Sequence, residues 1–304
     1  MAITAPNTLV LCGPTGVGKT ALALDVAEQL GTDILSADSR QVYRGLDIGT
    51  AKPTAAERAR VRHHWIDQLD VGEPTSAGAF SREADAYVAR CHGEGRPALA
   101  VGGSTLYVDA VIRGLADLPE VSENVASDVA VAAKSAAGRA RLFEELTRAD
   151  PASASTLDAT KGQRLARLVG LLRETGQAPS QLWAQGAPPA RTVRVVVLDL
   201  PRDELYRRIE RRVDEMLDAG LLDENRRLLA DGHRLDTPPL RTIGYHEPIR
   251  YLEGEIDEGE MVRLLKQNTR RYAKRQLTWF RRYPEALWVD ASDGLEGVMS
   301  AITD

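Results

Sequence analysis

The sequence has few cysteines, no long apolar run and no secretory leader. Its two cysteines, Cys12 and Cys91, form no Cys-x-x-Cys pair and cannot build a disulfide framework, which suits a reducing compartment. No apolar run approaches the roughly 18 residues that a membrane-spanning helix needs. The N-terminus lacks the charged, apolar and cleavage regions of a signal peptide. These absences predict a soluble, cytoplasmic protein without a membrane partner.

An excess of positive charge is also missing. The 304 residues carry a net formal charge of −5, which argues against a uniformly basic nucleic-acid coat but not against a local basic patch. Hydrophobic residues make up 43% and charged residues 27%, as in ordinary globular proteins. The five histidines show no metal-ligand spacing, and we expect His63-His64 to be structural.

Short apolar runs that alternate with helical periodicity predict the fold. Four runs read as buried strands and a fifth as a possible last strand: Thr8–Cys12, Asp33–Ala37, Ala98–Val101, Val193–Leu200 and Ala286–Val289. Helical periodicity follows several of them, as in Ala21–Leu30, which Gly31 ends. Such alternation predicts an α/β fold, with a parallel sheet flanked by helices.

The alternation breaks between Pro119 and Pro189. This stretch contains helical runs at 123–137, 139–148 and 164–175, and Gly186–Pro189 closes it. We therefore predict an all-helical insertion domain over 119–190, which divides a P-loop core into residues 1–118 and 191–304. In the second part of the core, single helices are expected at about 203–229 and 257–282.

The clearest motif lies between the first strand and the first helix. Residues 13–20 match the pattern G-x-x-x-x-G-K-[ST] and run Gly13, Pro14, Thr15, Gly16, Val17, Gly18, Lys19, Thr20. The glycines let backbone N–H groups surround an anion, Lys19 can reach terminal phosphates, and the Thr20 hydroxyl can ligate Mg²⁺. The motif predicts binding of a di- or triphosphate and leaves kinase, NTPase and other diphosphate chemistry open.

Further polar side chains stand near strand ends or on the helix after the fourth strand. Asp38 is either a base that positions a nucleophile or a cap of the next turn, and spacing alone leaves both readings open. Ser104 can donate to phosphate or cap the following helix. Arg208 is placed to face the phosphates, and Lys52 stands in a loop as an available amine. Asp199 ends an apolar strand as Mg²⁺-binding aspartates do, but an ordinary buried strand is the favoured interpretation.

Two regions suit nucleic acid. Between Arg263 and Pro284 there are eight basic residues and no acid, with Tyr272, Trp279 and Phe280 interleaved. Basic charge beside aromatic rings fits phosphate neutralisation and base stacking, although a solvated helix face with core-facing aromatics is the alternative. Gln163–Arg167 offers a second basic cluster.

Taken together, these segments resemble the tRNA dimethylallyltransferases. The resemblance extends over most of the chain: the P-loop at 13–20, SADSRQVYRGLDIGTAKP at 36–53, HHWID at 63–67, VGGSTLY at 101–107, QRLAR at 163–167, RTIGYHEP at 241–248 and AKRQLTWFRR at 273–282. That family transfers a dimethylallyl group from dimethylallyl diphosphate to N6 of the adenosine just 3′ of the tRNA anticodon. The resemblance therefore implies a monomeric prenyltransferase with tRNA as its partner.

The resemblance also implies roles for individual residues. Asp38, Ser104 and Arg208 would be catalytic, and the P-loop would hold the leaving diphosphate, or a nucleotide such as ATP, with Mg²⁺ at Thr20. The tRNA anticodon stem-loop would contact the insertion and these residues: Asp38, Ser39, Arg40, Gln41, Ser104, Gln163, Arg164, Leu165, Ala166, Arg167, Lys274 and Arg275. Three departures stand out: Ser104 where the family usually has Thr, Ala126 where some members have Arg, and no C-terminal zinc-finger spacing, which fits a bacterial type.

Three other functions would account for some of the same sequence features. An enzyme that prenylates free adenine nucleotides would use the same P-loop and Asp38. A small-molecule kinase is favoured only by the P-loop and the Asp199 strand, and a non-catalytic RNA-binding protein would leave its RNA unmodified. The basic, aromatic 263–284 segment and Gln163–Arg167 favour a polynucleotide acceptor over a free nucleotide.

Overall fold

The computed structural model describes residues 8–186 and 192–303, which divide into two compact units. One lies within Met1–Arg113 and Arg191–Asp304 and is called the core unit; the other lies within Gly114–Ala190 and is called the helical unit. The helical unit covers the stretch for which the sequence predicts an insertion. Apart from Gly186, the boundary predicted at 186–189 lies outside the described residues.

The core unit is built on a six-stranded sheet in the order β3-β2-β4-β1-β5-β6, and every neighbouring pair is parallel. This confirms the predicted α/β fold. The strands are β1 (Thr8–Cys12), β2 (Ile34–Ala37), β3 (His63–His64), β4 (Ala98–Gly102), β5 (Val193–Asp199) and β6 (Leu287–Asp290). The sequence missed β3 because a strand of two residues has no detectable periodicity.

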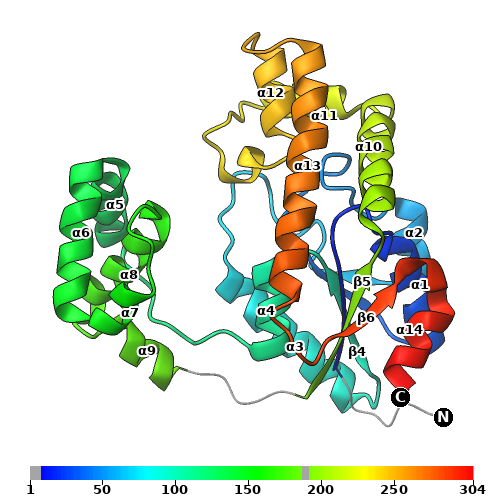
Figure 1. Ribbon diagram of the computed structural model, residues 1–304, viewed down its shortest axis with the longest axis horizontal. Helices are drawn as coiled ribbons and strands as arrows, with labels where there is room; N and C mark the ends of the chain where they lie inside the picture. The colour runs from blue at the N-terminus through cyan, green and yellow to red at the C-terminus, as the bar shows by residue number, and fades with distance from the viewer. Residues whose placement is uncertain (1–7, 187–191, 304) are drawn as a thin grey trace. The chain divides into compact units, whose positions relative to one another are not determined.

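Helices cover both faces of this sheet. Leu9 and Leu11 of β1 pack with α1 (Lys19–Leu30) and α14 (Gly294–Thr303) in the main hydrophobic cluster. The other face lies toward α3 (Ala77–Gly93) and α4 (Thr105–Arg113), which pack on each other and on β4 (Figure 1). Each fully buried aliphatic side chain contributes about 1.5–3 kcal/mol to this core. The short α2 (Ala55–Arg60) lies between β2 and β3 in the chain, and a capping box between Thr54 and Glu57 stabilises its N-terminus.

Four helices extend from the carboxyl end of the sheet. They are α10 (Arg202–Asp218), α11 (Leu221–Ala230), α12 (His246–Leu252) and α13 (Glu258–Phe280), with a short 3-10 turn η1 (Pro238–Arg241) between α11 and α12. Figure 1 shows α13 running from the sheet to the far end of this group. The single helix expected over 203–229 is wrong, because Gly220 has a φ of +96° and separates α10 from α11. A second 3-10 turn, η2 (Ala291–Asp293), precedes α14.

The helical unit has its own core. Its helices are α5 (Glu123–Lys134), α6 (Ala136–Ala149), α7 (Pro151–Ser155), α8 (Gly162–Thr175) and α9 (Pro179–Gln185). Leu142, Leu146 and Leu165 are buried in one cluster between them. The first predicted helix ends at Lys134 rather than at 137, because Ser135 caps α6 by accepting a hydrogen bond from the Gly138 N–H.

No helix in the described part of the chain is long and apolar enough to cross a membrane.

Candidate functional site

The P-loop joins β1 to α1 and forms an anion cradle. The motif leaves β1 at Cys12, and α1 begins at Lys19, with Gly18 at its N-cap in a left-handed conformation of φ +101°. Gly13 passes so close to β5 that a Cβ there would lie 2.6 Å from the Leu198 carbonyl oxygen. The glycines therefore allow both the turn of the loop and its close approach to β5, and the α1 N-terminus adds positive potential.

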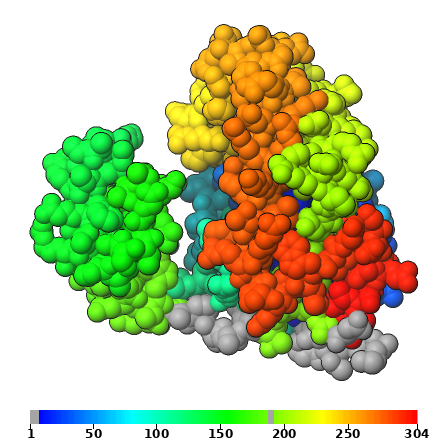
Figure 2. Space-filling model, viewed as in Figure 1, coloured from blue at the N-terminus to red at the C-terminus, as the bar shows by residue number. Residues whose placement is uncertain are grey.

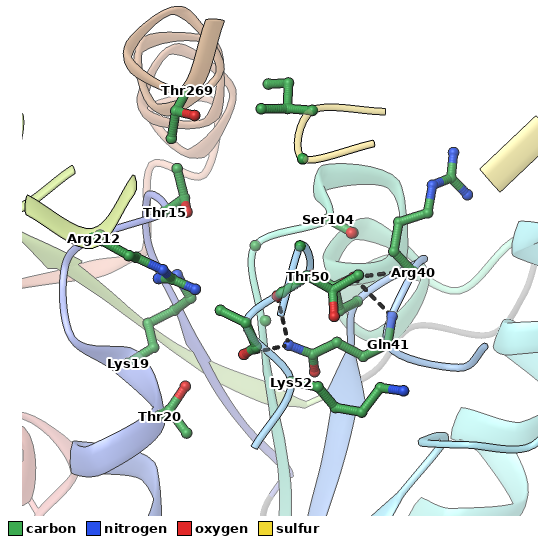
Figure 3. Close-up of a pocket in the computed structure, with 18 of the residues that line it drawn as sticks. Thr15, Lys19, Thr20, Arg40, Gln41, Thr50, Lys52, Ser104, Arg212 and Thr269 are labelled. Carbon is green, nitrogen blue, oxygen red and sulfur yellow. Dashed lines mark hydrogen bonds between the residues drawn. The ribbon is translucent and has the colours of Figure 1, made fainter. Parts of the chain in front are cut away.

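Two cations stand beside this cradle. The Lys19 Nζ donates to the carbonyl oxygens of Gly13 and Pro14 at 2.9 and 2.8 Å. Burial lowers the pKa of Lys19 to about 8, and the positive charge of Arg212 acts in the same direction. Burial also lowers the pKa of Arg212, which Asp38 partly offsets. In Figure 3 the Lys19 and Arg212 side chains reach toward the same space. Two desolvated cations that lie next to each other favour the binding of a multiply charged anion.

Asp38 follows β2 and holds a tight turn. Its Oδ1 accepts hydrogen bonds from the backbone N–H groups of Arg40 at 2.8 Å and Gln41 at 3.3 Å. The capping reading is therefore correct, and it is compatible with the other reading because Asp38 also lines the cavity. The nearby Tyr272 has its pKa raised to about 12, first by burial and then by the negative charge of Asp38.

Ser104 lies at the start of the segment after β4 and is buried. Its Oγ accepts a hydrogen bond from the Ser39 N–H at 3.0 Å and lies 3.3 Å from the Ser39 Oγ. The Ser104 carbonyl oxygen accepts hydrogen bonds from the Tyr107 and Val108 N–H groups of α4, whereas the Ser104 side chain faces the Asp38 turn. The two polar turns predicted at neighbouring strand ends are thus joined directly.

Gln276 was not singled out by the sequence, although it lies in the AKRQLTWFRR segment. It is 1% exposed; its Oε1 accepts the Thr15 N–H at 2.8 Å, and its Nε2 donates to the Gly103 carbonyl at 2.7 Å. Gln276 therefore fastens α13 to both the P-loop and the glycine-rich segment after β4.

These segments enclose one cavity of about 790 Å³. Its walls come from the P-loop, the Asp38 turn, the loop at 49–53, the segment after β4, and helices α10 and α13. Figure 3 shows Thr15 and Thr269 on one side and Arg40, Gln41 and Ser104 on another. The polar groups of one wall and the cations Lys19 and Arg212 thus face a common space large enough for two reactants.

Other predicted residues lie elsewhere. Arg208 is on α10, pairs with Glu204 at 2.5 Å and lies near Gly18, but the cavity wall contains Arg212 instead. The role of Arg208 stays a prediction. Asp199 accepts the Leu200 N–H and does not line the cavity, which agrees with its being an ordinary strand end.

Lys52 is not the available amine that the sequence predicts. Its side chain is 2% exposed and binds the Tyr43 carbonyl, Asp47 and Asp67. Figure 3 shows it directed away from the P-loop. The ammonium is buried because two carboxylates and a carbonyl replace its water.

The expected basic face of α13 is mostly paired. Arg263 binds Glu260, Lys266 binds Asp214, and Arg270 binds Glu210. Lys274 and Arg275 are exposed, and Arg275 both lines the cavity and lies over the Tyr272 ring. Figure 2 shows the α13 surface open to solvent along the core unit. The prediction of a free basic face is therefore wrong for Arg263, Lys266 and Arg270, which pair with carboxylates of the protein itself.

In the helical unit, the five residues predicted to contact tRNA divide by exposure. Gln163, Arg164 and Arg167 are exposed on α8. Leu165 is fully buried and Ala166 is 8% exposed, both in the core of the helical unit. The tRNA-binding prediction therefore narrows to the first three, because the other two stabilise the helix that presents them.

The residues present fit a magnesium ion held mainly by its ligand. No cluster of three or more His, Cys, Asp or Glu among the described residues could hold a metal alone. Thr20 lines the cavity beside Lys19. Because Mg²⁺ keeps several waters and takes much of its coordination from substrate phosphates, one hydroxyl at this position is an adequate protein contribution.

Sheet, P-loop and cavity together define a P-loop α/β protein with a pocket beside the loop. The sequence model of the IPP transferase family matches residues 41–283. The chain therefore belongs to the IPP transferase family.

Individual relatives agree with this assignment. A tRNA dimethylallyltransferase of Salinibacter ruber is 50% identical over 92% of this chain and 86% of the relative. The full-length tRNA isopentenylpyrophosphate transferase of Bacillus halodurans, a crystal structure, superposes with a TM-score of 0.71 at 34% identity and covers 98% of this chain and 97% of that one. A eukaryotic dimethylallyltransferase acting on tRNA, at 23% identity, shares the fold with a TM-score of 0.79 over 94% of this chain and 74% of that one.

Proposed function

We propose that this chain transfers a dimethylallyl group from dimethylallyl diphosphate to N6 of the adenosine just 3′ of a tRNA anticodon. The observation that carries the proposal is that Asp38 and the cationic P-loop open on one cavity. Alkylation of an amine by a diphosphate ester needs a carboxylate beside the amine, to accept its proton, and an anion cradle around the diphosphate that leaves. The family and its named relatives support the choice of prenyl donor and tRNA acceptor.

The P-loop stabilises the leaving group. Backbone N–H groups of the loop, Lys19 and Arg212 offset the negative charge that develops on diphosphate as the carbon–oxygen bond breaks. A Mg²⁺ ion, when bound at Thr20, supplies further positive charge to the diphosphate oxygens. The phosphorus–oxygen bonds stay intact, so no phosphoryl group moves.

Asp38 serves the acceptor. The adenine N6 attacks the allylic carbon while Asp38 accepts the proton that the amine loses, so a carbon–nitrogen bond forms as diphosphate leaves. The two hydrogen bonds to Oδ1 fix the carboxyl group, which assigns proton acceptance to Oδ2. Ser104 keeps the turn in place through Ser39. The adenosine has to leave its stack to enter the cavity, which costs little in an anticodon loop.

The RNA meets the protein at exposed basic residues of both units. Arg275 lines the cavity and Lys274 is exposed next to it on α13, whereas Gln163, Arg164 and Arg167 are exposed on α8. The charges of the four basic residues suit the backbone of an anticodon stem-loop. The reaction would take place in the cytoplasm, where tRNA is processed, with the protein acting as a monomer.

The test is mass spectrometry of a synthetic anticodon stem-loop after incubation with the protein, Mg²⁺ and dimethylallyl diphosphate. The proposal predicts a gain of one isoprene unit on the adenosine beside the anticodon. A stem-loop with guanosine at that position is the matched control and should gain nothing. Parallel reactions offer AMP as acceptor or ATP in place of the prenyl donor.

The three arms separate the competing functions. Prenylated AMP with unmodified RNA would assign the chain to nucleotide prenylation. ATP consumption with a phosphorylated product would indicate a kinase. RNA that binds but stays unmodified would indicate a binding protein.

A further inference from the structure

Glu224 is a buried carboxylate that the proposed chemistry does not use. It lies on α11, is 3% exposed and has no ion-pair partner in the part of the chain that the structure describes. Its Oε2 accepts the N–H groups of Asp47 at 3.1 Å and Ile48 at 2.8 Å, and its Oε1 accepts the N–H of Gly49 at 3.0 Å and the Tyr245 hydroxyl at 2.8 Å. Burying a charge is costly unless hydrogen bonds replace its water, and here four neutral donors do so.

The segment that Glu224 holds forms part of the cavity wall. Gly49 lines the cavity, as do Thr50 and Ala51. Ala51 has a φ of +48°, a left-handed conformation that a residue with a Cβ adopts only when its surroundings fix it. The fit is tight on the Glu224 side, because a Cβ on Gly49 would lie 2.6 Å from the Tyr245 ring.

Hydrogen bonds continue from this segment to Asp38. The Gln41 Nε2 lies 3.4 Å from the Thr50 carbonyl oxygen and 3.3 Å from that of Ala51. The Ser36 hydroxyl donates to the Gln41 Oε1 at 2.9 Å, and the Gln41 backbone N–H donates to the Asp38 Oδ1. Gln41 therefore connects the wall that Glu224 fixes to the turn that presents Asp38.

We propose that Glu224 is a positioning residue for prenyl transfer: it holds residues 47–51 in the conformation that lets Gln41 orient Asp38 toward the acceptor. This inference rests on the proposed function of Asp38. Glu224 acts at a distance and touches neither reactant. Its effect falls on the chemical step at the acceptor, whereas the P-loop, which Gln276 and Lys19 organise, keeps its affinity for diphosphate.

The variant Glu224→Gln tests this role at constant size. A glutamine has one acceptor oxygen in place of two, so at least one pair of donors loses its partner. We expect kcat on the stem-loop to fall at least tenfold, while the KM for dimethylallyl diphosphate and the affinity for inorganic diphosphate change less than twofold. Asp150→Asn is the matched control: Asp150 is 2% exposed, and its carboxylate accepts hydrogen bonds from Ser153 and Ser180 inside the helical unit. Its kcat should fall less than threefold.

A double variant identifies the path. If Glu224 acts through Gln41, adding Glu224→Gln to Gln41→Leu should lower kcat no further than twofold below the Gln41 variant alone. If the kcat of the double variant instead falls by the product of the two single-variant losses, Glu224 does not act through Gln41. An unchanged kcat in Glu224→Gln, or an equal loss in Asp150→Asn or in diphosphate affinity, would overturn the positioning role.

A readout that needs no turnover separates this inference from the proposed function. Amide hydrogen exchange of the folded Glu224→Gln protein should be faster than wild type at 47–51 and also at 40–41. If exchange at 40–41 is unchanged, the connection to Asp38 is absent, whatever the enzyme does with RNA. If the wild type leaves the stem-loop unmodified while 40–41 responds, the proposed function fails and the structural coupling stands. Should Glu224→Gln not fold, Tyr245→Phe, which removes a single donor, should still speed exchange at 47–51.

Discussion

Gln276 and Thr15, which are 261 positions apart in the chain, share a partly buried hydrogen bond of 2.8 Å between the side-chain Oε1 and the backbone N–H. The same side chain donates to the Gly103 carbonyl from its Nε2. A Cβ on Gly103 would lie 2.4 Å from that nitrogen, so the glycine allows the contact. One amide thus joins the anion cradle to the segment that holds Ser104.

Replacing Gln276 by Leu should destabilise the protein. The change leaves the partly buried Thr15 N–H and the buried Gly103 carbonyl without partners, and we expect the free energy of unfolding to fall by about 2–4 kcal/mol. Urea denaturation measures it. The exposed Gln181→Leu is the control and should change this free energy by less than about 0.5 kcal/mol. A Gln276→Leu protein as stable as wild type would show that the amide merely occupies space.

Lys19 should make diphosphate binding depend on pH. Its pKa is lowered to about 8, chiefly by burial, so the ammonium loses its proton as pH rises through 8. We expect the ratio of wild-type to Lys19→Met affinity for inorganic diphosphate to fall up to about tenfold between pH 7 and pH 9. Isothermal titration calorimetry measures both proteins, and the ratio removes the ionisation of diphosphate itself. A ratio that is constant or rises over this range would contradict the account.

Lys52 should be essential for stability. Lys52→Met leaves Asp47 and Asp67 beside an apolar side chain, and we expect a loss of about 3 kcal/mol in the free energy of unfolding. Thermal and urea unfolding measure it. Lys161→Met is the matched control, since that exposed residue lies 3.9 Å from Asp158 and its loss should leave stability nearly unchanged. If the two variants are equally stable, the ion pairs of Lys52 with Asp47 and Asp67 do not stabilise the loop at 47–53.

Basic residues of α13 should differ in their effect on RNA affinity. Lys274→Ala and Arg275→Ala should each lower the dependence of log K on log salt by about one for the stem-loop, because each removes an exposed positive charge that has no ion pair among the described residues. Arg263→Ala should change it much less, because Arg263 pairs with Glu260 at 2.6 Å. Fluorescence anisotropy over a salt series measures the slopes. Slopes equal to the wild-type slope for Lys274→Ala and Arg275→Ala would show that these two residues do not bind the phosphates.

Local motifs made the centre of the site predictable. The P-loop spacing, a polar residue after β2 and a glycine pair after β4 are each encoded in consecutive residues, and parallel strands bring their ends together. The strands themselves follow from short aliphatic runs, although Gly220 ended a helix that periodicity alone extended to 229.

Residues that act from a distance could not be found in this way. Arg212 stands among several arginines of α10, and only the folded helix shows that it lines the cavity while Arg208 pairs with Glu204. Glu224 and Gln276 owe their roles to donors more than 170 positions away in the chain. Lys52 looked available because the sequence does not show the carboxylates that fold around it.

The most direct test of the account is the single-turnover rate of prenyl transfer by Asp38→Asn with saturating stem-loop, Mg²⁺ and dimethylallyl diphosphate. Asparagine keeps an acceptor for the Arg40 and Gln41 N–H groups but cannot accept the amine proton, so the rate should fall by about 10²–10⁴ while affinity for inorganic diphosphate stays within twofold. A rate within threefold of wild type would contradict the role of Asp38 as the base.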